Sequence, residues 1–149
     1  MASLREQLAG GDKRSKVVDD ACGVLDQEVA DKGGLTGIAI KGAYKIVQGV
    51  KPGFVREAVD GLLDDFLDAL DPIYQEAVQK QRPAGAFVRE NASRVADALL
   101  AITDRRAQKA KSQVVRGAYD KLRPMAKKQV EAAAPRLGDL LGRHAAPAA

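Results

Sequence analysis

The sequence predicts an all-α protein, a compact bundle of two duplicated helical halves. Three observations lead to this prediction. Ala, Leu, Val, Lys, Arg and Asp dominate, and aromatic residues make up only 4% of the 149 residues, which suits helices better than sheets. Apolar residues recur at helical spacing in segments that glycine or proline separates. A short motif at 41–44 also recurs at 116–119.

Three helices are expected in the N-terminal third of the chain. Ser3 begins a capping box, so a short helix is predicted from there to Gly10. A second helix is expected from Ser15, as its cap, to about Lys32. The segment 34–50 is apolar over about two-thirds of its circumference on a helical wheel. We therefore expect this third helix to be nearly surrounded by the rest of the protein.

Prolines are expected to open the helices in the middle of the chain. An amphipathic helix is predicted from Pro52 to Leu70, because proline is tolerated in a first helical turn. Asp71 and Pro72 have the pattern of an N-cap followed by such a proline. A new helix is therefore expected to begin there and to run to about Gln81.

The C-terminal part is expected to be helical as well. One long amphipathic helix is predicted at about 86–106, and a further helix carries the second copy of the motif as far as Arg123. Pro124 and Pro135 are each expected to begin a further short helix, since proline disrupts a helix interior. The tail, His144 together with 145–149, is expected to fray.

The recurring motif predicts an internal duplication. Residues 41–44, Lys-Gly-Ala-Tyr, match residues 116–119, Arg-Gly-Ala-Tyr, and both copies are followed by a proline and an amphipathic helix. We predict one domain, 1–149, whose halves at about 13–82 and 84–144 pack about a pseudo-twofold axis.

The motif's glycines and tyrosines, Gly42, Tyr44, Gly117 and Tyr119, allow two interpretations. A glycine inside a helix costs about 1 kcal/mol relative to alanine, and close approach of another helix would offset that cost. Alternatively, the bare glycine surface and the neighbouring tyrosine hydroxyl line a ligand pocket between the halves. The first interpretation is a packing contact, and the second is a binding site.

The run from Val17 to Pro72 carries a resemblance to a known family. Its segments EVADKGGLTG, IKGAY, VKPGFV and LDPIY resemble an uncharacterised bacterial family of small all-helical proteins. The similarity continues to Leu141. The resemblance implies a single all-helical domain, and no function comes with it.

The composition excludes several kinds of catalytic chemistry. His144 is the single histidine, so Cys–His, Ser–His and multi-histidine zinc sites cannot form. The glycines match neither a phosphate-binding loop nor a dinucleotide fingerprint. We expect no catalytic residue, no metal and no cofactor, and we do not expect an enzyme.

Cysteine usage and hydropathy bear on location. Cys22 is the single cysteine, and its apolar neighbours predict a small buried residue in a reducing compartment. No segment approaches the roughly 18 apolar residues of a membrane span, and the N-terminus lacks the apolar core of a signal peptide. We therefore expect a cytoplasmic protein without a membrane span.

One face of the helix predicted at 52–70 is acidic. The segment 57–76 holds seven acidic residues and no Lys or Arg. The Glu-x-x-His motif of di-iron bundles is absent, which argues against a metal site. The face is expected either to be solvated or to contact a basic partner. The candidate residues for that contact are Glu57, Asp60, Asp64 and Asp68.

A basic segment follows at 105–128, with nine basic residues and one acid. If its helix is continuous, the side chains of Arg105, Lys109, Arg116 and Arg123 form one stripe. The stripe is a solvated surface, a site for nucleic-acid phosphates, or a protein contact that includes self-association with the acidic face. The candidate residues are Arg105, Lys109, Arg116, Arg123, Lys127 and Lys128.

These patterns favour a non-enzymatic interaction or structural module. It would present separate acidic and basic helix faces to a protein partner or to a second copy in a homodimer. One alternative is a sequence-nonspecific nucleic-acid-binding protein that uses the helix at 105–128. A second alternative is a carrier of a small apolar ligand between the two halves.

Overall fold

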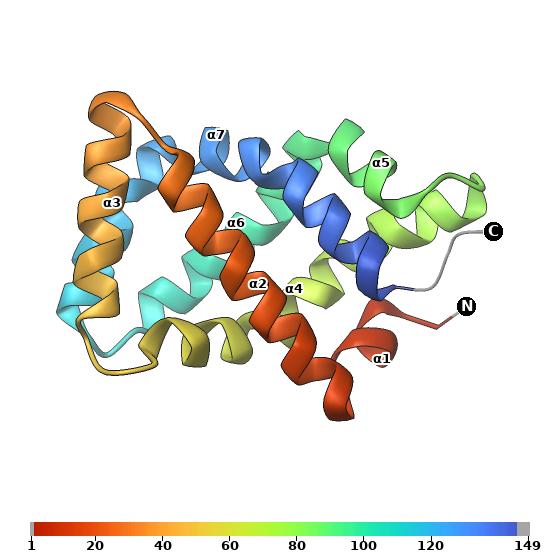
Figure 1. The fold of residues 1–149 in the computed structure, drawn as a ribbon, viewed down its shortest axis with the longest axis horizontal. Coiled ribbons are helices and arrows are strands. Elements are labelled where there is room, and N and C mark those ends of the chain that lie inside the picture. Colours follow the sequence, from red (N-terminus) through yellow and green to blue (C-terminus); the bar gives the residue numbers. More distant parts are fainter. Residues whose placement is uncertain (1, 146–149) are drawn as a thin grey trace.

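The computed structural model describes residues 2–145, which form helices and no strand (Figure 1). The helices are α1 (Leu4–Leu8), α2 (Gly11–Asp31), α3 (Gly34–Gln48), α4 (Phe54–Gln79), α5 (Ala84–Glu90), α6 (Ala92–Lys109) and α7 (Gln113–His144). The prediction of an all-α protein is confirmed. The short first helix is also confirmed, since the Ser3 hydroxyl accepts a hydrogen bond from the Glu6 amide at 3.1 Å.

The two longest helices, α4 and α7, organise the fold. α7 packs along α5 and α6, while α4 contacts α1, α2, α5 and α6. In Figure 1, α2 crosses the front of the molecule diagonally, α3 stands at one end, and α5 lies towards the other. Ion pairs join α2 to α7, including Arg143 to Asp20 at 2.8 Å and Arg136 to Glu28 at 3.1 Å.

The core lies where α1, α2, α4, α5, α6 and α7 meet. The largest fully buried side chains are Leu4, Leu8, Val17, Val18, Tyr74, Val88, Val95 and Leu141. Burying a leucine or valine side chain contributes about 1.5–3 kcal/mol. No charged or polar residue of the described chain is buried, so stability rests on this apolar cluster.

Three prolines lie inside helices. α4 continues through Pro72, and α7 continues through Pro124 and Pro135, so the helix starts predicted at these prolines are wrong. All three prolines are exposed, and water can satisfy the carbonyl groups that lose an amide partner. Buried residues stand within three positions on both sides of Pro72 and of Pro135, and their packing holds the helix together there. Asp71 accepts a hydrogen bond from the Leu4 amide at 2.9 Å, so it satisfies the first turn of α1.

Two other predicted helix boundaries are also wrong. The single helix expected at 86–106 is two helices, α5 and α6, with a break at Asn91. The Asn91 side-chain amide donates to the Phe87 carbonyl at 2.8 Å, which caps α5 without a glycine or proline. α2 begins at Gly11, whose φ of 58° only glycine adopts easily, and Ser15 lies inside the helix.

The segment 34–50 is not surrounded by protein, contrary to the prediction. α3 buries only Gly37, Ile40 and Ala43, whereas three large apolar residues are exposed. These are Leu35 at 87%, Ile38 at 70% and Ile46 at 54%. α3 stands at one end of the molecule, where neighbouring helices cover only one of its sides (Figure 1).

The predicted duplication is not confirmed as a symmetric fold. The segment 13–82 contributes most of α2 and all of α3 and α4, while 84–144 contributes α5, α6 and the long α7. His144 is the last residue of α7 and contacts Asp20, so its predicted fraying is wrong. Residues 146–149 of the predicted frayed tail lie outside the described residues.

Candidate interaction surfaces and an apolar cavity

The acidic face of α4 is covered by arginines of the same chain. The Arg14 guanidinium contacts Asp60 and Asp64, each at 2.8 Å, and Arg5 contacts Asp68 at 3.0 Å. The hydrogen bond from Arg14 lowers the pKa of Asp64 below its usual value. These three acids therefore have basic partners that α1 and α2 supply.

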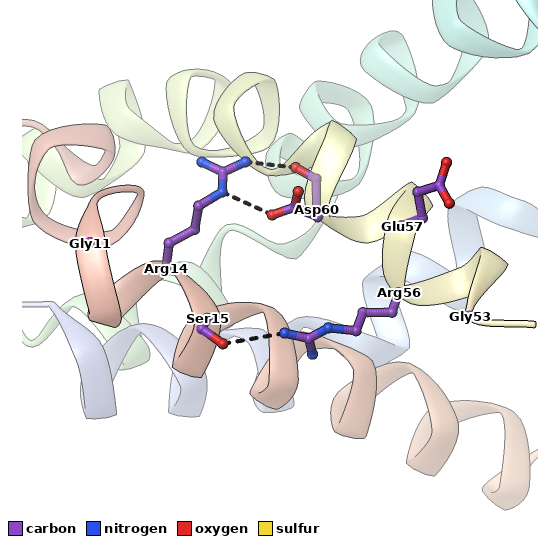
Figure 2. A pocket seen from close by; sticks show the side chains of 7 residues that line it. All are labelled: Gly11, Arg14, Ser15, Gly53, Arg56, Glu57 and Asp60. Atoms are coloured by element: carbon purple, nitrogen blue, oxygen red, sulfur yellow. Dashed lines mark hydrogen bonds and ion pairs between the residues drawn. The ribbon is translucent and has the colours of Figure 1, made fainter.

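A polar hollow between α2 and α4 shows how closely these charges are matched. Figure 2 shows Arg14 beside Asp60, where it donates to the carboxylate and to the backbone carbonyl, both at 2.8 Å. It also shows Arg56 directed at the Ser15 hydroxyl, at 3.3 Å. Arg56 forms an ion pair with Asp19 as well. The hollow has a volume of about 400 Å³, and its arginines are already bound within the chain.

Glu57, the fourth residue of the predicted acidic set, lies at the start of α4. It pairs with Lys51 at 3.0 Å, so every residue of this set has an intrachain cation. The sequence locates the acids but does not indicate their partners, Arg5 and Arg14. No local signal links those arginines to α4, because the contacts join segments more than 45 residues apart.

The basic segment is not the continuous stripe that the sequence predicts. α6 ends at Lys109 and α7 begins at Gln113, where the Ser112 hydroxyl accepts from the Val115 amide at 3.2 Å. The helix is interrupted at this cap, so Arg105 and Lys109 lie on a different helix from Arg116 and Arg123. The single stripe across both helices is therefore wrong.

Several of the basic side chains have acidic partners inside the chain. Arg123 contacts Asp104 at 2.8 Å and Lys127 contacts Asp97 at 3.1 Å. The hydrogen bond from Arg123 lowers the pKa of Asp104. Within the described residues, the basic side chains of 105–128 that form no ion pair are Arg105, Lys109, Lys111, Arg116, Lys121 and Lys128.

The two tyrosines of the repeated motif make matching contacts. The Tyr44 hydroxyl donates to Asp26 on α2, and the Tyr119 hydroxyl donates to Asp104 on α6 at 2.5 Å. In each case the acceptor lies on the preceding helix. Burial, followed by the bond to Asp104, raises the pKa of Tyr119 to about 12, so this phenol stays protonated near neutral pH.

The motif's glycines do not mediate helix packing. A Cβ atom added to Gly42 or Gly117 would meet nothing within 4 Å, so the predicted close approach is wrong. The close approach occurs at Gly85 of α5 and Gly138 of α7. A Cβ on Gly138 would lie 2.6 Å from the Gly85 carbonyl oxygen. The sequence prediction misses this pair, although both glycines stand beside core residues.

An apolar cavity of about 960 Å³ lies among α4, α6 and α7, with α2 and α3 contributing to its wall. Tyr119 is the one residue of the predicted pocket set that lines it, whereas Gly42, Tyr44 and Gly117 do not. Arg105, Arg106 and Lys109 belong to the lining, so the end of α6 brings three cations to a space whose wall is mostly apolar.

α3 presents an exposed apolar face at the end of the molecule. Leu35, Ile38 and Ile46 are spaced three and eight residues apart, which places them on one side of the helix. Gly42 falls between them and leaves open space beside the helix backbone. We call these four residues the α3 face. The exposed lysines Lys41 and Lys45 flank it, and α3 has no acidic residue.

The described residues were compared with the requirements of a metal site and of a membrane-spanning helix. No group of three His, Cys, Asp or Glu side chains is placed to hold a metal ion within residues 2–145. The single histidine, His144, contacts Asp20 at 2.8 Å. The single cysteine, Cys22, is half-buried, and burial raises the pKa of its thiol. In that same range, every helix is too short or too polar to cross a bilayer.

The geometry defines a class: an all-helical protein with an exposed apolar helix face and an apolar cavity. Residues 4–145 match the pattern of the "Family of unknown function (DUF6918)". The chain belongs to this family, which confirms the resemblance to an uncharacterised family. No curated protein and no solved structure matches the chain. The family brings no function, so the proposals below rest on the residues themselves.

Proposed function

We propose that this protein is a non-enzymatic interaction module that binds an acidic partner protein through the α3 face. The exposure of this face is the observation that carries the proposal. Monomeric proteins rarely expose large contiguous apolar patches, and such patches often mark protein contacts. Leu35 at 87% and Ile38 at 70% exposure are the two most exposed large apolar residues of the described chain.

The shape of the α3 face fits a helical partner. Gly42 lies between Ile38 and Ile46, and the space beside its α-carbon, where another residue would carry a Cβ atom, is open. A partner helix could therefore approach the α3 backbone closely at this point, with apolar side chains on either side. An amphipathic helix that buries its apolar stripe in this way is a common recognition mode.

Charge selects the chemistry of the partner. Lys41 and Lys45 flank the α3 face and form no ion pair within the described residues. Aspartate or glutamate along the edge of a partner helix would pair with them and steer the encounter. A second copy is a poorer fit, because Arg5 and Arg14 already occupy its acidic face on α4.

The proposal also covers nucleic acid as an alternative partner and the location of the protein in the cell. Nucleic acid is a weaker candidate partner, since the α3 face is apolar at its centre and phosphates gain nothing from such contacts. We also place the interaction in the cytoplasm, because the single cysteine, Cys22, suits a reducing compartment.

Site-specific photo-crosslinking tests this proposal. A benzoylphenylalanine residue would replace Ile38 in the full chain, and a matched control would carry it at exposed Asp12 on α2. We expect position 38, and not position 12, to crosslink to a protein whose captured segment is an acidic amphipathic helix. A synthetic peptide of that segment should bind the purified protein, as measured by fluorescence anisotropy.

Three outcomes would overturn the proposal. Crosslinked dimers of the chain would show that the α3 face binds a second copy, and crosslinked nucleic acid would favour the phosphate-binding alternative. Equal labelling from positions 38 and 12 would show that the α3 face has no specific partner. Anisotropy with labelled DNA at stepped salt concentrations checks the nucleic-acid alternative independently, because phosphate binding weakens steeply as salt rises.

A further inference from the structure

The cavity among α4, α6 and α7 has the size and walls of a ligand site. Its volume of about 960 Å³ is near the upper end of the roughly 300–1,000 Å³ usual for small-molecule sites. Five helices contribute apolar side chains to it. Its main apolar residues are Leu25, Val47, Phe54, Leu62, Ile102 and Leu122. All but Ile102 are half-buried, because they face this space.

Most polar groups of the cavity already have partners within the chain. Glu57 pairs with Lys51 at 3.0 Å, and Asp65 pairs with Arg106 at 3.0 Å. Arg106 also donates to the Gly61 carbonyl at 3.1 Å. Each carboxylate of the lining is therefore paired with a cation, which reduces its repulsion of an anion that enters.

The hydroxyl groups of the lining are likewise satisfied. The Thr103 hydroxyl lies 2.7 Å from the Tyr119 hydroxyl, which in turn donates to Asp104. Neither group is left as an unpaired nucleophile or base in the cavity. The lining therefore offers binding surface rather than reactive groups.

Two cations of the lining have no such partner. Arg105 and Lys109 are exposed, lie one turn apart at the end of α6, and form no ion pair within the described residues. Residues four apart on a helix stand on the same side, so both charges can reach one anionic group. A guanidinium also matches a carboxylate or phosphate through paired hydrogen bonds.

We propose that this cavity binds an amphipathic anion, with its alkyl chain among the apolar side chains and its carboxylate or phosphate head between Arg105 and Lys109. The site is separate from the α3 face. Val47 faces the cavity from α3, whereas Leu35, Ile38 and Ile46 are exposed on the helix's outer side. Failure of either proposal therefore leaves the other standing.

Calorimetric titration with decanoate, decyl phosphate, decanol and acetate tests the chemistry. We expect saturable one-to-one binding of the two amphipathic anions, weaker binding of decanol and none of acetate. Tighter binding of decanoate than of decyl phosphate would assign a carboxylate ligand, and the reverse would assign a phosphate ester. No saturable binding of either anion, or equal affinity for decanol, would overturn the proposal.

Charge variants test the head-group site. Replacing both cations, Arg105→Gln with Lys109→Gln, should weaken decanoate binding roughly tenfold and leave decanol binding unchanged. The matched control, Arg116→Gln with Lys121→Gln, removes two unpaired cations outside the cavity and should leave both affinities unchanged. Equal losses in the two double variants would show that decanoate responds only to overall charge, and would overturn the head-group site.

Two further measurements locate the alkyl chain. In the wild-type protein, decanoate should shift the methyl NMR signals of Leu62, Ile102 and Leu122 most strongly. The largest shifts at Ile38 and Ile46 instead would mean surfactant-like adsorption on the α3 face, and would overturn the cavity site. Ala107→Phe, which places a ring in the cavity, should weaken binding of decanoate and decanol, and unchanged binding in this variant would also overturn it.

Discussion

α3 is the more apolar of two consecutive helices, yet it is far less buried than α4. Six residues of α4 are buried, from Leu63 to Ala77, whereas α3 buries three residues, of which only Ile40 is large. Leu67 of α4 is 3% exposed and Leu35 of α3 is 87% exposed. The two leucines have the same side chain and opposite environments.

The difference follows from position in the fold. α4 runs through the centre, where α1, α2, α5 and α6 contact it, while α3 stands at the end of the molecule (Figure 1). Apolar content measures how much a helix would gain from burial. It does not say which other helix is available to cover it. An apolar helix at an edge is therefore a surface that another molecule can use.

The largest expected change in the free energy of unfolding comes from replacing the buried leucine of α4, and the exposed leucine of α3 provides the comparison. Leu67→Ala should lower the free energy of unfolding by about 2–5 kcal/mol, because it removes buried methyl groups and leaves a cavity. Leu35→Ala should change it by less than about 0.5 kcal/mol, because the side chain is in water. Urea denaturation followed by circular dichroism measures both values. Similar losses in the two variants would mean that α3 is covered in solution.

A second pair of variants compares a packed glycine with an open one. Gly138→Ala should cost about 1–3 kcal/mol, since the new Cβ would lie 2.6 Å from the Gly85 carbonyl oxygen. Gly42→Ala should stabilise the protein by up to about 1 kcal/mol, because alanine is the better helix former and the space is open. Thermal melts of both variants provide the measurement. A stabilising Gly138→Ala substitution would contradict the close contact of α5 with α7.

The ion pairs on α4 should contribute less and should depend on pH. Arg14→Gln removes contacts with Asp60 and Asp64 and should cost about 0.5–1 kcal/mol at neutral pH. The pKa of Asp64 is lowered in the folded state, so its contribution is complete above the usual value of 3.8. The contribution is lost as the pH falls through the lowered pKa.

Urea denaturation of the wild type and the Arg14→Gln variant from pH 7 to pH 2 tests this dependence. The gap between their free energies of unfolding should be constant above about pH 5 and should close below it. Lys16→Gln on α2 is the control, because this exposed lysine forms no ion pair within the described residues. A gap that widens in acid would contradict the assigned role of Arg14.

The smallest expected change in stability concerns the lysines beside the α3 face. Lys41→Glu with Lys45→Glu should alter the free energy of unfolding by less than about 0.5 kcal/mol, since both side chains are exposed. The same pair should abolish crosslinking from position 38, because an acidic partner would meet like charge. Lys16→Glu should leave crosslinking intact. Retained crosslinking in the double variant would exclude an acidic partner.

Much of the local structure could be predicted because its causes are local. The Ser3 cap and the glycines before α2 and α3 mark helix ends through their own backbone chemistry. The prolines misled the prediction, since tertiary packing carries α4 through Pro72 and α7 through Pro124 and Pro135. Asn91 ends α5 with a side-chain hydrogen bond to the Phe87 carbonyl, and the prediction of one helix at 86–106 overlooked this residue.

The candidate surfaces were predictable only in part. The acids of α4 and the basic residues after residue 104 are evident from the sequence, because charge runs are visible along the chain. That Arg5 and Arg14 bind those acids, and that Ser112 divides the basic segment, is not evident there. A pocket between the halves was predicted, but of its four predicted residues only Tyr119 lines the cavity, since five separate helices supply the wall.

The sequence by itself determined that this protein is helical, where several of its helices begin, and which side chains carry charge. These properties follow from residue types and from spacing within one segment. Only the tertiary structure decided that α3 is exposed, that α4 is central, and that Arg105 and Lys109 lie beside an apolar cavity. The reason is physical. Burial and charge pairing depend on which distant segments are in contact, and the packing of the whole fold determines those contacts.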